Sequence, residues 1–575
     1  MGRFNLVEEP WIAVLDNDSG ERIEVSLLDL FENARKYRCL AGEMETQNFA
    51  VLRLLLSIVQ TVFSRFDVNG ECLPGVKVDN RYVQVEPVDE DDKEDYIIAL
   101  EKNWSDLFSL NEFPQIVSEY LKCWRDRFFL FDDEHPFYQV NEKLKDEIID
   151  RIPDKKSGTF VKGDSINRTI SQSNRVEKIA IFSPVSDRFT EYMSSDEEFT
   201  RWLIMFQGYP KNGGRTTKLK KSGQKGSKGW LLDIGGIYLE GETLFRTLIF
   251  NYIPVLSNNK FVTRVQHPCW EFDEKDMINR LLNENVIDNL SELYTNWSRA
   301  IYVDPNWTLN DPVEMEVIEL PPVDHTENSV EPMTLWQKND GKDANGYYSP
   351  KKHNPEEALW RSFGIITMKD EKDRENYQTG IYQQFERIAK VAGSRWTDIV
   401  GVGVKSDSYG TIEDEISDVI VINDIVMADD EWITRINDVV EKTKNAIEKN
   451  YSNFLREIME MRNPTRGDKK KEKKRELIIK RYIEGIYYDI DPKFNEWLSD
   501  IKPKDDKEEK ILSWNNQILN ILKERADYYI ENCMTRDING IVKRDGDRKE
   551  VKNIFGVYVQ FISEVHRCFR TGGRS

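Results

Sequence analysis

The part of the chain after about residue 430 constrains the fold most, because proline and glycine become sparse there and long helical periodicities dominate. Breakers such as Asn463-Pro464, Lys502-Pro503 and Gly540 separate four predicted helices. Helices of this length pack lengthwise against one another, so the pattern favours a four-helix bundle. The predicted helices are Glu431–Met461, Lys474–Leu498, Glu508–Cys533 and Lys549–Phe569, and the last has a predicted buried stripe of Phe555, Tyr558, Phe561, Ile562 and Val565.

The rest of the chain has a mixed character. A length of 575 residues exceeds what one hydrophobic core supports, since single cores stop growing at about 250 to 300 residues. Before residue 430, helical stretches alternate with proline- and glycine-rich segments and short apolar strands, without an internal repeat. We therefore predict an α+β fold, with an irregular mixed N-terminal globular domain over residues 1–428 and a C-terminal four-helix bundle over residues 429–575.

The N-terminal segment gives the clearest local predictions. The sequence PWIAVLDNDSGERIEVSLLDLF predicts a β-hairpin that turns at Asp16 to Gly20, followed by a helix that begins at Ser26. A second helix, Gln47 to Val62, is apolar nearly all round, which predicts burial on several sides. The apolar run from Phe49 to Phe63 is interrupted by polar residues and is shorter than the roughly 20 residues of a bilayer span, so we predict no membrane helix.

The start of the chain and its cysteines indicate a reducing compartment. The sequence MGRFNLVEEPW lacks the basic, apolar and small-residue succession of a secretion signal, which predicts a cytoplasmic protein. The six cysteines are widely scattered, and no two of them form half of a Cys-x-x-Cys metal site. We expect them to be reduced and mostly buried.

The search for catalytic residues finds little. Only five histidines are present, and none pairs at the i, i+4 spacing that places two imidazoles on one helical face for zinc. His135 and His267 both precede proline in aromatic surroundings, which favours a structural role over that of a catalytic base. The sequence contains neither a Gly-x-Ser-x-Gly elbow nor a Walker-type loop. We predict no catalytic residue, no metal site and no cofactor.

The charge of the chain limits where nucleic acid can bind. A net charge of −21 opposes binding to phosphates, whose repulsion acts over about 10 Å, so local basic segments must carry any contact. One segment, KNGGRTTKLKKSGQKGSKGW from Lys211 to Trp230, is rich in glycine and has no acidic residue. Such a segment holds phosphates without reading sequence, although an ordinary solvated surface loop has the same composition. Its cations are Lys211, Arg215, Lys218, Lys220, Lys221, Lys225 and Lys228.

A second basic run, from Arg466 to Arg475, stands at a predicted helix start. It contains five lysines, and a run of this kind is more often a solvated helical face than a binding site. We therefore treat it as the second candidate for a DNA contact. Its lysines are Lys469, Lys470, Lys471, Lys473 and Lys474.

Eight pieces of sequence, in order along the chain, resemble the CasA family, the large subunits of the type I-E CRISPR surveillance complex called Cascade. Each piece alone is weak, but eight in order are specific. They are NLVEEPWIAV, FFLFDDEHPFYQV, NGGRT, YLEGETLFRTLIFN, HPCWE, LYTNWSRAIYV, VEPMTLW and YSPKKHNPEEALWRSF.

The resemblance implies a non-catalytic subunit with an N-terminal globular domain and a C-terminal four-helix bundle. Its implied partners are a guide RNA, the backbone subunits of the complex, double-stranded target DNA and a helicase-nuclease that is recruited in trans. The implied role is to inspect duplex DNA for a protospacer-adjacent motif (PAM) and to help open the duplex.

The resemblance also implies two local sites. A loop that docks the subunit onto the RNA 5′ handle and the backbone subunits falls in the stretch from Asn141 to Arg175, with Lys155, Lys156 and Lys162. A wedge that reads the PAM through the minor groove falls in GVKSDSYGTIE, from Gly403 to Glu413, between strands Asp398–Val402 and Val419–Ile422. The wedge residues implied here are Lys405, Ser406, Asp407, Ser408 and Tyr409.

The sequence departs from the family at the wedge, because Asp407 and Ser408 stand where Asn and Gln are expected. An aspartate near phosphates is unfavourable, whereas Tyr409 offers a stacking surface and Lys405 a phosphate contact. The cysteine zinc knuckle of several family members is also missing, and residues 304–330 are acidic and proline-containing instead. Two other readings of the chain stay open: a structural adaptor that joins protein partners without touching DNA, and a metal-dependent nuclease.

Overall fold

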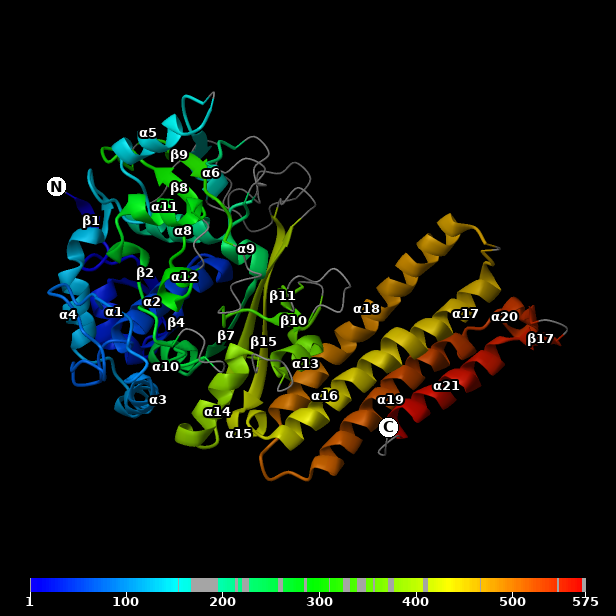
Figure 1. The fold of residues 1–575 in the computed structure, drawn as a ribbon. Helices are drawn as coiled ribbons and strands as arrows, with labels where there is room; N and C mark the ends of the chain where they lie inside the picture. The colour runs from blue at the N-terminus through cyan, green and yellow to red at the C-terminus, as the bar shows by residue number, and fades with distance from the viewer. Residues whose placement is uncertain are drawn as a thin grey trace. The chain divides into compact units, whose positions relative to one another are not determined.

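The computed structural model of the chain is shown in Figure 1. Contacts between Cα atoms divide the chain into two compact units. The first unit comprises Met1–Glu357, Met368–Val391 and Thr397–Val419, and the second comprises Ala358–Thr367, Ala392–Trp396 and Ile420–Ser575. The structure describes residues 2–153, 155–166, 195–211, 216–219, 227–256, 262–283, 287–309, 311–323, 331–338, 348–354, 357–370, 377–406, 412–465, 467–545 and 548–570.

The N-terminal hairpin and helix are confirmed. Strand β2 (Ile12–Asp16) pairs antiparallel with β3 (Arg22–Val25) and also with β4 (Tyr37–Leu40). Gly20 has φ +70° in the connecting turn, a conformation that glycine adopts without a steric penalty. Helix α1 (Leu27–Asn33) begins where predicted, because the Ser26 hydroxyl accepts the Asp29 N–H at 3.1 Å.

Helix α2 (Glu45–Phe63) is the core of the first unit. It packs against α4 (Ile116–Cys123), α8 (Asp196–Gly208), α10 (Leu244–Asn251) and α12 (Leu290–Tyr294). By length and composition it could cross a membrane, but 94% of its most apolar window is buried inside the protein. The prediction of a helix buried on several sides is therefore confirmed.

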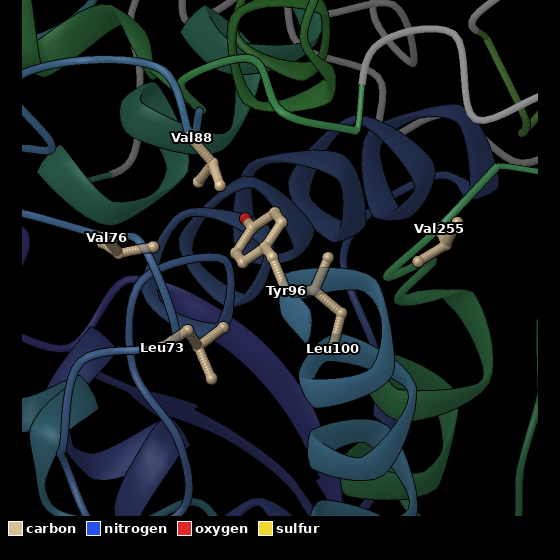
Figure 2. Close-up of a cluster of buried hydrophobic side chains, with 6 residues drawn as sticks. All are labelled: Leu73, Val76, Val88, Tyr96, Leu100 and Val255. Atoms are coloured by element: carbon tan, nitrogen blue, oxygen red, sulfur yellow. The ribbon is translucent and has the colours of Figure 1, made fainter. Parts of the chain in front are cut away.

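A smaller apolar cluster covers one end of α2, around helix α3 (Lys93–Leu110). Figure 2 shows Tyr96 among its members, with Leu100 one helical turn further along. The Tyr96 hydroxyl donates to the Ser64 carbonyl at 2.8 Å, which satisfies the one polar atom that this side chain buries. The other members are Leu73, Val76, Val88 and Val255.

Two three-stranded sheets of the first unit position the segments with predicted functions. One has the order β6–β9–β8 and consists of β6 (Thr159–Lys162), β8 (Arg299–Tyr302) and β9 (Glu314–Glu319). The other has the order β15–β14–β7 and consists of β7 (Gly236–Glu240), β14 (Trp396–Ser406) and β15 (Ile412–Asn423).

The other elements before residue 430 are short. The strands are β1 (Arg3–Asn5), β5 (Phe129–Phe131), β10 (Trp336–Lys338), β11 (Tyr348–Pro350), β12 (Lys369–Asp370) and β13 (Tyr377–Gln378). The helices are α5 (Glu142–Asp150), α6 (Gly163–Ile166), α9 (Trp230–Ile234), α11 (Glu274–Leu282), α13 (Phe363–Ile366), α14 (Gly380–Ala392) and α15 (Asp424–Met427), with short turns η1 (Ala34–Lys36), η2 (Arg125–Arg127), η3 (Cys269–Glu271) and η4 (Leu359–Ser362).

The second unit is the predicted helical bundle, and its long helices lie alongside one another in Figure 1. The first helix is α16 (Asp430–Lys444), which continues through the π-helical η5 (Asn445–Tyr451) into α17 (Ser452–Arg462). Helix α18 (Lys469–Ser499) begins earlier than predicted, because the Asp468 carboxylate caps the N–H groups of Lys470 and Lys471. Helix α19 (Lys507–Glu531) agrees closely with its prediction.

The start of the last helix was predicted wrongly. After the short helix α20 (Thr535–Asn539), residues 549–552 belong to β17 (Arg548–Lys552), which pairs with β16 (Ile541–Asp545). Helix α21 begins only at Ile554 and ends at Arg570. The predicted buried stripe is confirmed at Phe561 and Val565 but wrong at Phe555, which is 46% exposed, while Tyr558 and Ile562 are half-buried. The buried residues are Ile554, Val557, Phe561 and Val565.

Candidate nucleic-acid interface

The predicted wedge, Gly403 to Glu413, includes the end of one long strand and the start of the next. Strands β14 and β15 are neighbours in their sheet and are joined only by residues 407–411, so they form a hairpin. Lys405 is half-buried near the end of β14, and Ser406 is the last residue of that strand. The other wedge residues, Asp407, Ser408 and Tyr409, lie outside the described residues, so their roles stay a prediction.

A close backbone contact fixes the hairpin at Gly403. A Cβ atom added at this glycine would lie 2.5 Å from the carbonyl oxygen of His353, which no real contact tolerates. Strand β14 therefore rests directly on the backbone of His353, and only glycine allows this approach. His353 itself is buried, and burial lowers its pKa, with Asp418 and Glu357 opposing that shift.

An acidic pair lies at the other end of the same strand. Asp398 of β14 is directly opposite Glu240 of β7. Burial raises the pKa of both carboxyl groups, and Arg38 opposes the shift in each case. A cavity of about 130 Å³ beside the pair is lined by Cys39, Glu45, Tyr238 and Glu240 among others. Like charges directly opposite one another destabilise a sheet, so this end of the hairpin is under electrostatic stress at neutral pH.

The structure describes residues 211, 216–219 and 227–230 of the basic segment. Lys211 is exposed, while the Lys218 ammonium lies 3.2 Å from a Glu319 carboxylate oxygen and its side chain is only 17% exposed. Lys228 is 4.0 Å from Asp233. The ion pair gives Lys218 a role inside the fold that the sequence did not predict. Arg215, Lys220, Lys221 and Lys225 lie outside the described residues.

The predicted docking segment is more ordered than the sequence indicated. The expected loop from Asn141 contains α5, β6 and α6 in its described part, so a continuous loop is wrong for residues 142–166. The Asn141 side chain begins α5 by accepting the Leu144 N–H at 2.9 Å, and β6 pairs with β9. Lys155, Lys156 and Lys162 are exposed, as a docking role requires.

The docking segment and the basic segment meet side by side. The Thr217 N–H donates to the Thr159 hydroxyl at 2.8 Å, and the Thr217 hydroxyl donates to the Ser157 carbonyl at 3.3 Å. Two segments that the sequence assigned to different partners are thus joined at one sheet.

The basic segment is also connected to the hairpin. Asp233 lies 4.0 Å from the Lys228 ammonium and 3.8 Å from that of Lys352. Lys352 donates to the Leu232 carbonyl at 2.6 Å. Burial lowers the pKa of Lys352, with Asp233 opposing this shift and Lys228 adding to it. The next residue, His353, supplies the backbone on which Gly403 rests. The three predicted segments are therefore linked by contacts within the first unit.

One group of side chains in the described residues could in principle hold a metal ion. It consists of His135, Asp273 and Glu274, whose ligand atoms lie within 4.8 Å of one another. The guanidinium of Arg127 already contacts all three, at 3.0 Å from Asp273 and 2.8 Å from the His135 Nδ1 atom. A resident positive charge opposes a second cation, so the arrangement is better described as an ion network. His267 stacks on Phe272 with 3.8 Å between ring centroids, which favours the structural role predicted for it.

The basic run of the bundle covers the first turns of α18. All five of its lysines are exposed. Positive charge at a helix N-terminus opposes the helix dipole, so the run does not stabilise the helix that carries it.

Sequence reasoning missed two buried residues, Arg299 and Glu319, that hold the ends of the basic segment. The only signal was the presence of charged residues in two apolar strand patterns: Arg299 in SRAIYV, and Glu316 and Glu319 in EVIEL. Such a residue is either at an exposed edge or is paired inside the protein, and the sequence does not distinguish the two.

Comparisons with known proteins agree on one family. The family model described as CRISPR-associated protein Cse1 matches residues 5–524. A CasA/Cse1 protein of Thermus thermophilus is 23% identical over 274 residues, which are 47% of this chain and 42% of that protein. The crystal structure of Thermobifida fusca Cse1 is similar with a TM-score of 0.71 and 19% identity, covering 99% of this chain and 98% of that one. A chain of a structure titled CRISPR RNA-guided surveillance complex is similar with a TM-score of 0.63 and 15% identity, covering 98% and 100%.

Proposed function

The chain belongs to the Cse1 family of CRISPR-associated proteins, and we propose that it is the non-catalytic large subunit of a type I-E surveillance complex that recognises the PAM on duplex DNA. The observation that carries this proposal is the linkage of three segments in one unit. Contacts through Thr217 and through Asp233 join the docking segment, the basic segment and the hairpin. A subunit that reads a motif and opens a duplex needs such a linkage, because the three contacts must have a fixed spacing.

In this proposal the hairpin tip reads the motif. Residues 407–411 connect the two strands, and Gly403, near the end of β14 that leads into them, is held against the backbone of His353, which supports a fixed approach to the predicted reading residues. The minor groove offers a degenerate base code, and an inserted side chain there starts strand separation. Tyr409 is the residue suited to stacking and Lys405 the one suited to a phosphate.

The basic segment then holds the DNA backbone, and the bundle lysines at the start of α18 give a second contact. Phosphate contacts of this kind fix the register of a protein on a duplex without reading its sequence. They also explain how a chain of net charge −21 binds DNA, since the lysines act locally within the range of salt screening.

The remaining partners follow from the family. We propose that the exposed Lys155, Lys156 and Lys162 contact the guide RNA and the backbone subunits in the cytoplasm. Cutting is then the task of a helicase-nuclease recruited in trans, which agrees with the occupied Arg127 network at the best candidate for a metal site.

The test is a comparison of two DNA targets. We expect the triple variant Lys405→Ala, Ser408→Ala, Tyr409→Ala to weaken binding to PAM-bearing targets by about 1–3 kcal/mol while binding to PAM-free duplex changes little. The measurement is a titration of the assembled complex with both duplexes. Replacing exposed Lys390 on α14 by alanine provides a control within the same unit.

Equal loss on both targets would show that the hairpin contributes only general affinity. Binding that does not depend on salt in any variant would favour the structural adaptor instead.

A further inference from the structure

Arg299, at the start of β8, is a buried side chain whose hydrogen bonds go to both ends of the basic segment. Its Nη2 atom donates to the Lys211 carbonyl at 3.1 Å and to the Ser227 carbonyl at 2.9 Å. Its Nη1 atom donates to the Ser227 hydroxyl at 3.1 Å and to the Ser298 carbonyl at 2.7 Å. Residues 211 and 227 are far apart along the segment, yet one guanidinium group holds them together.

Glu319, at the end of β9, completes the anchor. It is 1% exposed, and its Oε1 atom accepts the Ser227 N–H at 2.6 Å and lies 3.2 Å from the Lys218 ammonium. Its backbone N–H donates to the Thr217 carbonyl at 2.9 Å, and its carbonyl accepts the Leu219 N–H at 2.8 Å. Glu319 thus binds the middle and one end of the segment at the same time.

The bonding of Arg299 differs from that of Arg53 and Arg65, two other fully buried arginines. Arg53 and Arg65 each make two bonds of 2.8 Å to one carboxylate, Glu331 and Glu271 respectively. The Glu319 carboxylate is 3.8 Å from Arg299, beyond hydrogen-bond distance. Burial lowers the pKa of Arg299 to about 10, with Glu319 opposing the shift. The Arg299 guanidinium is charged at neutral pH, and the Lys211 carbonyl and the Ser227 carbonyl and hydroxyl accept its hydrogen bonds in place of water.

We propose that Arg299, together with Glu319, is a positioning residue that holds residues 211, 217–219 and 227 of the basic segment together and so sets Lys211 and Lys228 in place for DNA phosphates. This inference rests on the proposed role of the segment as a DNA contact. A segment whose ends are already fixed loses less conformational entropy on binding than one with free ends. The planar fork of arginine reaches two carbonyls and a hydroxyl together, whereas lysine presents a single ammonium group.

The first experiment measures the anchor itself, without DNA. In the full chain, Arg299→Lys should accelerate hydrogen exchange of the Thr217, Leu219 and Ser227 amides by about tenfold. Arg65→Lys is the matched control, because Arg65 is equally buried and also bonds two backbone carbonyls, those of Tyr82 and Gln266, outside the basic segment. Unchanged exchange in Arg299→Lys, or the same acceleration in the control, would overturn the anchor.

The second experiment measures what the anchor does for binding. A fluorescein-labelled DNA duplex is titrated with the full chain at several salt concentrations. We expect Arg299→Lys to weaken binding about tenfold and to lower the slope of log affinity against log salt by about 1, with Arg65→Lys keeping the wild-type slope. Faster exchange with an unchanged slope would overturn the positioning role.

A milder variant and an independent control keep the two proposals separate. Glu319→Gln retains an acceptor for the Ser227 N–H but removes the charge that pairs with Lys218, so it should accelerate exchange of the Thr217 and Leu219 amides even if Arg299→Lys fails to fold. If the wild-type chain and the assembled complex both bind duplex without a salt slope, the proposed DNA contact is wrong. The exchange experiment still decides in that case whether Arg299 anchors the segment.

Discussion

At the scale of single residues, the first unit contains buried ion pairs, and removal of one partner should destabilise the fold far more there than in the exposed pairs on its surface. Arg65 and Glu271 are fully buried, and the Glu271 carboxylate also accepts the Tyr120 hydroxyl. Removal of one partner from a pair of this kind leaves an uncompensated charge in a low-dielectric interior.

We therefore expect Arg65→Met to lower the free energy of unfolding by about 3–5 kcal/mol. The control is Arg35→Met, which breaks the exposed pair with Glu112, at 3.2 Å, and should cost at most about 1 kcal/mol. Urea unfolding followed by tryptophan fluorescence measures both variants. Similar losses would contradict the distinction between the two pairs.

The acidic pair of Asp398 and Glu240 gives a prediction about pH. Because the pKa of Asp398 is raised in the folded state, its ionised form destabilises the fold, and stability falls as pH rises above the ordinary pKa of 3.8. Asp398→Asn should therefore raise stability at neutral pH by about 0.5–1 kcal/mol, and the gain should vanish below about pH 4. Thermal unfolding across pH checks this, with the exposed Asp18→Asn as the variant that should show no gain at any pH.

At the scale of elements, the last helix shows which side chains bury its face. Phe561 is 2% exposed and stacks on Phe454 with 4.8 Å between ring centroids, whereas Phe555 on the same helix is 46% exposed. Phe561→Ala should lower the free energy of unfolding of the bundle by about 3–5 kcal/mol, and Phe555→Ala by about 1 kcal/mol or less. Denaturation of the two variants, which share one chemical change, decides the register of α21. A loss for Phe555→Ala as large as that for Phe561→Ala would show that Phe555 is buried, as the sequence predicted.

The same helix shows how far sequence reasoning reaches. Long periodic helices such as α16 and α19 are predictable, because an apolar stripe repeats over many turns. The start of α21 is not, because Lys549 to Lys552 have no periodic pattern and their state depends on pairing with β16. The hairpin of β14 and β15 was located in the sequence through the resemblance to the CasA family, and its strands extend beyond the predicted Asp398–Val402 and Val419–Ile422. The contact between Thr217 and Thr159 was not, because it joins segments distant along the chain.

At the scale of the whole molecule, the net charge of −21 means that the proposed DNA binding must come from separate basic segments. We expect replacement of Lys218, Lys220, Lys221 and Lys225 by glutamine to reduce the salt slope by about 3, which is close to 1 for each phosphate that a lysine no longer neutralises, because Lys218 is already paired with Glu319. Replacement of Lys469, Lys470, Lys471 and Lys473 is the matched change in the second unit. Duplex titrations with both variants rank the two segments, and a larger effect of the bundle variant would reverse their order.

The absence of catalysis is also testable on the whole chain. Incubation of the purified chain with duplex and single-stranded DNA in Mg²⁺ or Mn²⁺ should give no cleavage that is lost when residues of the protein are replaced. The variant Asp273→Asn, Glu274→Gln removes the closest set of potential metal ligands in the described residues, so it identifies any activity that belongs to this chain. Cleavage that persists through purification and is abolished in this variant would make the protein a nuclease.

The close approach at Gly403 has a consequence for engineering. Position 403, near the end of β14, admits only glycine, whereas residues 407–411 connect two regular strands, so the two positions should tolerate substitution very differently. We expect exchange of residues 407–411 between relatives to transfer motif preference, and a library randomised there should yield folded proteins as often as the parent does. The same library at position 403 should yield almost none.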